Sequence, residues 1–270
     1  MNGLSKNQIF KGGKTTDESC QMTDSRITSS KRFLSAFIGT SLGILIIATV
    51  GIALHIQSIE PNGKLVATKS NETIDVDGKT YPKATIELGV FADNEQESKA
   101  DPAVRLKSGK QNKHDWVHYG PSSHLVLPAN SYITVTIKSY DGGEQLNNPY
   151  FGKVIGTVGG VVNVDGKDIT ELPADKVQHT WTLHGLPTST QEPLFVNVPI
   201  LKVEEDDNGF VPTEDPGTNM KGHTITFSFL TKGPGEYVWN CQFPCGDGTY
   251  QKFGAAMSTY GYMSGRVSVV

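Results

Sequence analysis

The sequence has little charge, few cysteines and no excess of basic residues. Charged residues make up 19% of the 270 residues and hydrophobic residues 37%, which excludes a highly charged disordered chain. The 29 glycines and 14 prolines exclude a coiled coil, because such proteins take about half of their residues from strong helix formers. A net charge of −4 provides no basic surface for nucleic acid, and three cysteines are too few for a small disulfide scaffold.

Motifs for acid–base or nucleophilic catalysis are also missing. The chain contains no H-E-x-x-H and no P-loop sequence, and no set of carboxylates or nucleophiles stands out by its spacing. We therefore expect a protein that is not an enzyme and has no nucleic-acid partner.

One long hydrophobic run is present near the N-terminus. Residues 33–54 are 22 residues without a charge, and a helix that rises about 1.5 Å per residue would cross a membrane over this length. A buried core helix is seldom uncharged for so long. A cleavable signal peptide has an apolar segment of only about 7–15 residues and a short leader, whereas this run follows 32 residues. We predict a tail at 1–32 and an uncleaved transmembrane anchor at 33–55.

The flanks of this run predict its orientation. Residues 1–32 carry six basic and three acidic residues, and Lys31 and Arg32 directly precede the run. The positive-inside rule then places the N-terminus in the cytoplasm and the later residues outside the plasma membrane, as a single-pass protein. The chain after residue 32 carries 18 basic and 25 acidic residues, which suits a partner with a basic docking face.

The rest of the chain predicts a mostly β domain. Residues 56–80 are polar and turn-rich, which predicts a linker with at most one short strand, and residues 81–270 predict one exterior domain. Aromatic and β-branched residues then recur with period two, separated by Gly, Pro, Asp and Asn, which predicts an antiparallel sandwich or barrel. The runs are Thr85–Phe91, Ser131–Ser139, Val154–Val164, His179–Leu183, Leu194–Ile200, Thr224–Leu230, Tyr237–Cys241 and Arg266–Val270. Residues 92–123 are too polar for a core strand and predict a surface excursion with a short helix.

The C-terminal residues hold the most specific pattern. A strand sequence G-x-Y-x-W-x-C spans residues 235–241, and the loop after it contains Cys245. The sequence Met-Ser-Gly-Arg-Val, from Met263, opens the last run, and Val-Gln-His-Thr-Trp, with His179, opens an earlier one. These patterns resemble the cupredoxins, the blue-copper fold. They are closest to membrane-anchored bacterial and archaeal cupredoxin-like domains and to the copper domain of cytochrome c oxidase subunit II. The resemblance implies a cupredoxin-like antiparallel β-sandwich after the anchor.

The resemblance also implies copper as the cofactor and a set of ligands. His179, Cys241, Cys245 and Met263 stand at or near the family's ligand positions, with Met257 as an alternative methionine. A thiolate, an imidazole and a weak thioether suit copper in both of its oxidation states. The bound metal itself would deprotonate the thiol, so no separate base is needed.

The loop departs from the family pattern in one respect. Blue-copper proteins have a second histidine between the cysteine and the methionine, and residues 241–270 contain none. The Cys-x-x-x-Cys spacing resembles the binuclear centre of oxidase subunit II, but Thr249 and Lys252 stand where that centre has His and Met. The two cysteines could also form a disulfide outside the membrane. The sequence leaves open whether the two cysteines bind copper or form a disulfide, and whether a metal site would hold one ion or two.

The remaining histidines and the third cysteine have no motif around them. His184 follows His179 by five residues and would point to the opposite face of a strand. Cys20 lies in the predicted cytoplasmic tail, so it would not meet the other cysteines. We expect four further histidines to be surface or turn residues; they are His114, His118, His124 and His223.

The expected function is single-electron transfer by a membrane-anchored, copper-binding exterior protein of a respiratory chain. A redox protein or an oxidase subunit would be its partner, and the anchor would raise its effective concentration there. Two alternatives stay open: a copper-free cupredoxin-like accessory or structural subunit of a membrane oxidase complex, with the cysteines as a disulfide, and a Cu(I) carrier.

Overall fold

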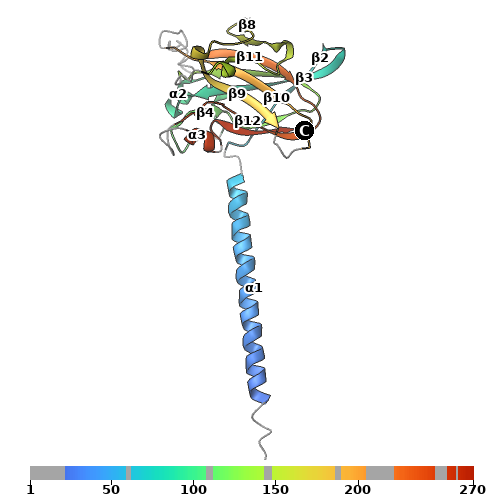
Figure 1. Cartoon of the computed structure of the whole chain (residues 1–270), viewed down its shortest axis with the longest axis vertical. Coiled ribbons are helices and arrows are strands. Elements are labelled where there is room, and N and C mark those ends of the chain that lie inside the picture. The colour runs from blue at the N-terminus through green and yellow to red at the C-terminus, as the bar shows by residue number, and fades with distance from the viewer. Residues whose placement is uncertain are drawn as a thin grey trace, which may run out of the picture. The chain divides into compact units, whose positions relative to one another are not determined.

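The computed structural model describes residues 22–58, 62–107, 112–142, 148–185, 190–204, 222–246, 254–259 and 261–270. The chain divides into two compact units, residues 1–59 and 60–270 (Figure 1). The first contains helix α1 (Met22–Ser58) and the second contains all of the strands.

Helix α1 carries the hydrophobic run. Its segment Arg32–Leu54 is long and apolar enough to cross a membrane, and none of it is buried within the structure. The hydroxyls of Thr40 and Thr49 donate hydrogen bonds to the carbonyls four residues earlier. A hydrocarbon environment tolerates polar side chains whose hydrogen bonds are made within the helix itself.

The second unit is a sandwich of two β-sheets (Figure 1). The first sheet has the order β1 (Lys64–Val66), β5 (His124–Leu127), β13 (Ser264–Val269), β12 (Gly235–Asn240), β9 (Val177–Gly185) and β10 (Phe195–Leu201). The second has the order β2 (Thr68–Val76), β3 (Lys79–Phe91), β6 (Tyr132–Ser139), β11 (His223–Leu230), β7 (Val162–Val164) and β8 (Lys167–Ile169), with β4 (His118–Gly120) paired to β3. Pairing is parallel in β1–β5, β5–β13 and β3–β6 and antiparallel elsewhere. The predicted mostly β sandwich, preceded by one apolar helix, is confirmed.

The core lies between the two sheets. Strand β6 buries every second residue, as its alternating sequence predicts. The ring of Trp181 in β9 lies 5.4 Å and 6.0 Å, between centroids, from those of Phe227 and Phe229 in β11, so inner faces of both sheets meet there. Burying an aliphatic or aromatic side chain of this kind stabilises the fold by roughly 1.5–3 kcal/mol.

Short helices occupy the connections. Helix α2 (Asn94–Lys99) is capped by Asp93, whose carboxylate accepts from the Gln96 amide, and α3 (Ala255–Ser258) precedes β13. The 3₁₀ turns are η1 (Pro102–Val104), η2 (Pro149–Gly152), η3 (Val158–Gly160) and η4 (Ala174–Lys176).

The structure corrects three sequence predictions. Residues 56–80 contain β1, β2 and the start of β3 rather than at most one short strand; β2 is polar because most of its residues are exposed on both faces. Residues 92–123 contain the predicted short helix α2, but also the fully buried strand β4. The run 154–164 is a strand only at β7, because the positive φ of Gly156 (+76°) and the 3₁₀ turn Val158–Gly160 interrupt the extended backbone before it.

Candidate metal centre

Two neighbouring strands of the first sheet hold the residues of the candidate site. His179 lies near the start of β9, and Cys241 directly follows β12, with which β9 pairs. The Cys241 amide donates to the Met263 carbonyl at 2.9 Å, which ties the end of β12 to the start of β13. Strand pairing therefore gathers residues that lie far apart in the sequence.

His179, Cys241 and Cys245 come together as one buried cluster. His179 Nδ1 lies 3.1 Å from Cys245 Sγ and 3.7 Å from Cys241 Sγ, and the two sulfurs are 3.4 Å apart. Their nearest donor atoms all lie within 4.8 Å of one another. The two cysteines are free thiols. One imidazole nitrogen and two sulfurs at these distances form a soft donor set that suits copper.

Backbone amides stabilise a thiolate at Cys241. The Thr180 and Phe243 N–H groups each point at Cys241 Sγ at 3.4 Å. Burial on its own raises the pKa of Cys241, but hydrogen bonds with Cys245 and His179, the positive charge of His179 and the Thr180 amide outweigh burial and hold the pKa well below its usual range. The hydrogen bond with Cys241 and then burial raise the pKa of Cys245 well above its usual range.

Asp141 orients the imidazole from the side opposite the sulfurs. Its carboxylate Oδ2 lies 2.7 Å from His179 Nε2, and both residues are buried. Burial lowers the pKa of His179, but the bonds to Asp141 and Cys241 and their charges outweigh it and raise the pKa to about 9. Sequence reasoning missed Asp141, because Asp-Gly-Gly after a predicted strand is an ordinary turn sequence.

The two candidate methionines differ in position. Met263 lies just before β13 and is fully buried, beside Cys241 through the backbone bond already described. Met257 lies on α3, half-buried against the same core. Gly246 follows Cys245 and has φ +86°, and a Cβ on it would lie 2.6 Å from the Cβ of Ala256. Gly246 thus lies close against α3.

An aromatic layer lies next to the cluster along the strands. Trp181 follows His179 by two residues, and Trp239 precedes Cys241 by two residues. The two tryptophan rings stack with centroids 6.4 Å apart. Tyr119 of β4 meets Trp239 edge-on at 4.8 Å. The Tyr119 hydroxyl is buried and has no hydrogen-bond partner among the described residues. Burial, followed by the charges of Cys241, Cys245 and Asp141, raises its pKa well above the usual range.

The other described histidines lie outside the cluster. His184 bonds Asn240, as expected of a residue on the other strand face, and His223 bonds Asp165. His118 and His124 are buried, which corrects the expectation of surface or turn positions. The half-exposed His114 stacks on Trp116 with ring centroids 4.1 Å apart.

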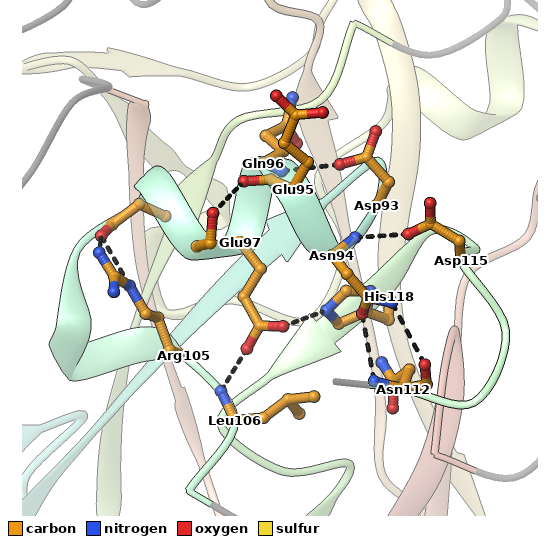
Figure 2. A network of polar contacts seen from close by, with 12 residues as sticks. Asp93, Asn94, Glu95, Gln96, Glu97, Arg105, Leu106, Asn112, Asp115 and His118 are labelled. Atoms are coloured by element: carbon orange, nitrogen blue, oxygen red, sulfur yellow. Dashed lines mark hydrogen bonds and ion pairs between the residues drawn. The ribbon is translucent and has the colours of Figure 1, made fainter. Parts of the chain in front are cut away.

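His118 belongs to a second buried polar network, drawn in Figure 2. Its Nε2 lies 3.2 Å from Glu97 Oε2, and its Nδ1 lies 2.9 Å from the Trp116 carbonyl oxygen. The second carboxylate oxygen of Glu97 accepts from the Leu106 amide at 2.6 Å. Asn94 adds contacts with Asp115 and the Asn112 backbone. The network ties α2 to β4 and so holds the polar excursion against the sandwich.

No family model and no curated protein matches the chain. Among solved structures, the chain is similar to that of auracyanin B, with 14% sequence identity, a TM-score of 0.29, and coverage of 76% of this chain and 97% of that chain. In this chain, the strand order of the first sheet makes β9 and β12 neighbours, and their antiparallel pairing places His179 and Cys241 at the same end of the two strands.

Proposed function

We propose that this chain is a membrane-anchored, extracytoplasmic cupredoxin-like protein that binds copper and transfers single electrons to or from a redox protein or oxidase subunit of a respiratory chain. One observation carries the proposal: the buried cluster of one imidazole and two thiols at the ends of β9 and β12. Helix α1 and the basic residues before its apolar segment support an anchor with a cytoplasmic N-terminus in the plasma membrane.

The donor set fits copper by its chemistry. His179, Cys241 and Cys245 would hold the ion, with Met263 as a weak thioether ligand and Met257 as the alternative. Bound copper would supply a one-electron couple. The chain's own residues exclude water by burial, stabilise a thiolate through the Thr180 and Phe243 amides, and fix the ring through Asp141.

Two alternatives keep support from particular observations. The two sulfurs lie 3.4 Å apart, so a shift of about 1.4 Å would bring them to the roughly 2.05 Å of a disulfide bond, and residues 241–270 lack the second histidine. Both observations favour a copper-free accessory or structural subunit of a membrane oxidase complex. The two thiols beside buried Met263 favour a Cu(I) carrier, because sulfur donors prefer the monovalent ion. In each case we propose a protein that is not an enzyme.

The test uses the full chain, purified in detergent with its thiols reduced. Copper is added, and the bound metal and the visible spectrum are measured for the wild type, Cys241→Ser and the matched control Cys20→Ser. We expect stoichiometric copper and a strong thiolate-to-copper absorption in the wild type and the control, and neither in Cys241→Ser. A wild type that is reduced, folded and binds no copper in either oxidation state would leave the accessory subunit; binding of Cu(I) alone would leave the carrier.

A further inference from the structure

Asp141 brings a third acidic group to the candidate site. It lies two residues after the end of β6, and its Oδ2 lies 2.7 Å from His179 Nε2, while Nδ1 of the same ring faces the two sulfurs. The fractional exposure of these residues is 7% for Asp141, 3% for His179, 0% for Cys241 and 8% for Cys245. Water therefore screens their charges poorly.

We propose that Asp141 makes this site selective for a divalent ion over a monovalent one. The inference rests on the proposed metal-binding function. An occupied site contains two thiolates, one neutral imidazole and the Asp141 carboxylate, hence three negative charges. A divalent ion leaves one of them uncompensated and a monovalent ion leaves two. In a buried site each uncompensated charge is costly, so the carboxylate favours the higher charge.

Asp141 has an orienting effect that must be separated from this effect of charge. A ligand histidine commonly donates its second N–H to a carboxylate, which fixes the tautomer and the ring orientation. Here the Nε2–H bond to Asp141 leaves the Nδ1 lone pair directed at the side of the ring where the sulfurs lie. Orientation should help ions of either charge equally, whereas the carboxylate charge should discriminate between them.

The substitution Asp141→Asn separates the two effects. The asparagine carbonyl oxygen still accepts from His179 Nε2, so the ring keeps its orientation, but the negative charge is gone. Asp165→Asn is the matched control, because Asp165 also bonds a histidine, His223, through a carboxylate oxygen at 2.6 Å, in an exposed pair.

The affinities to compare are those for Co(II) and Cu(I). Co(II) reports binding by its thiolate charge-transfer and d–d absorption and, unlike Cu(II), stays divalent in the presence of a reductant. The full chain in detergent with a reductant is titrated with each ion against a chromophoric chelator. We expect Asp141→Asn to shift the ratio of Co(II) to Cu(I) affinity toward Cu(I) by about 10- to 100-fold, the range for such outer contacts. Asp165→Asn should leave the ratio unchanged.

The outcomes distinguish failure of this inference from failure of the proposed metal-binding function. Equal loss of both affinities in Asp141→Asn, with an unchanged circular dichroism spectrum, would reduce Asp141 to an orienting residue and overturn the inference. An unchanged ratio with unchanged affinities would overturn it too. A wild type that binds neither ion would instead overturn the proposed metal site. If Asp141→Asn is poorly folded, Asp141→Glu is measured in its place. This variant keeps the negative charge, so the inference requires it to show the wild-type ratio of Co(II) to Cu(I) affinity.

Discussion

His179 and His118 are both buried and both contact a buried carboxylate, yet their surroundings suit different purposes. His118 faces oxygen acceptors at both ring nitrogens: Glu97 at 3.2 Å (Figure 2) and the Trp116 carbonyl at 2.9 Å. His179 faces Asp141 at one nitrogen only, and two sulfurs lie near the other. Burial and a carboxylate contact are therefore common to both histidines and do not identify a candidate metal ligand. The two differ in the partner of the second ring nitrogen, which is a carbonyl oxygen for His118 and sulfur for His179.

Replacing each histidine by alanine should have the largest effect and should distinguish the role of His179 from that of His118. Either change removes the histidine that pairs with a buried carboxylate, so we expect each to lower the free energy of unfolding by about 3 kcal/mol. Only His179→Ala should abolish metal binding, because it removes a donor. Denaturant unfolding of the metal-free chains and metal titration of the folded ones measure the two effects. Loss of metal binding in folded His118→Ala would contradict the distinction.

The pH dependence of stability should sharpen the contrast at His179. Its pKa is raised from 6.5 to about 9, so its contribution is complete below pH 6.5 and is lost as the pH rises toward 9. Cys241 has a lowered pKa, so its contribution has the opposite sign: it is complete above the usual thiol pKa and is lost as the pH falls. The two oppose each other in the metal-free wild type.

We therefore expect the free energy of unfolding of Cys241→Ser to fall more steeply than that of the wild type between pH 6.5 and 8.5. The serine removes the thiolate contribution together with the Cys241 hydrogen bond and charge that help to raise the pKa of His179, but it keeps the Asp141 hydrogen bond, which is the largest of the effects that raise it. Denaturant unfolding at several pH values, with all samples free of metal, gives the two slopes. Parallel slopes would show that the thiolate and the imidazolium do not oppose each other.

Two buried tyrosines extend the comparison to neutral groups, with a smaller effect. The Tyr140 hydroxyl accepts from the Asp101 amide at 3.2 Å, whereas the Tyr119 hydroxyl has no partner among the described residues. Tyr140→Phe should cost about 1 kcal/mol of stability, while Tyr119→Phe should be neutral or stabilising, because it removes an unpaired buried donor. Thermal and denaturant unfolding compare the two. A loss in Tyr119→Phe as large as that in Tyr140→Phe would point to a buried partner of its hydroxyl.

The exposed pair of His223 and Asp165 should show the smallest effect. The Asp165 side chain is 47% exposed, and solvent screens a pair of this kind. Asparagine also tolerates the positive φ of 49° at this position. We expect Asp165→Asn to change the free energy of unfolding by less than about 0.5 kcal/mol. A larger loss, by the same denaturant measurement, would mean that an exposed histidine–carboxylate pair stabilises this fold as much as a buried one.

The site residues that the sequence predicts are those that a local strand pattern marks. His179 and Cys241 lie in alternating runs with their own patterns, and Cys245 follows at a fixed spacing. Asp141 has no such pattern, because its role arises from a contact with a strand 38 positions later. Only the packing of the two sheets places it there.

The fold shows the same division. Strands β6 and β11 alternate clearly because one face of each is buried, and both were predictable. Strand β2 is exposed on both faces, so no alternation marks it, and β4 is buried on both faces with a polar sequence. In β4 the His118 side chain is buried with both ring nitrogens close to oxygen atoms, those of Glu97 in a different element and of the Trp116 carbonyl. Such compensation between distant residues leaves no trace in a local pattern.

The place of β13 in the first sheet has a consequence for biosynthesis. This strand lies between β5 and β12, although it is the last described strand in the chain. During synthesis, β5 and β12 emerge well before the strand that joins them, and the segment with Met263 emerges with it. The first sheet therefore closes only after β13 has been synthesised. A metal ion arriving earlier would find the cysteines on an open edge, so we expect the proposed metal site to mature after synthesis of β13 and not during it.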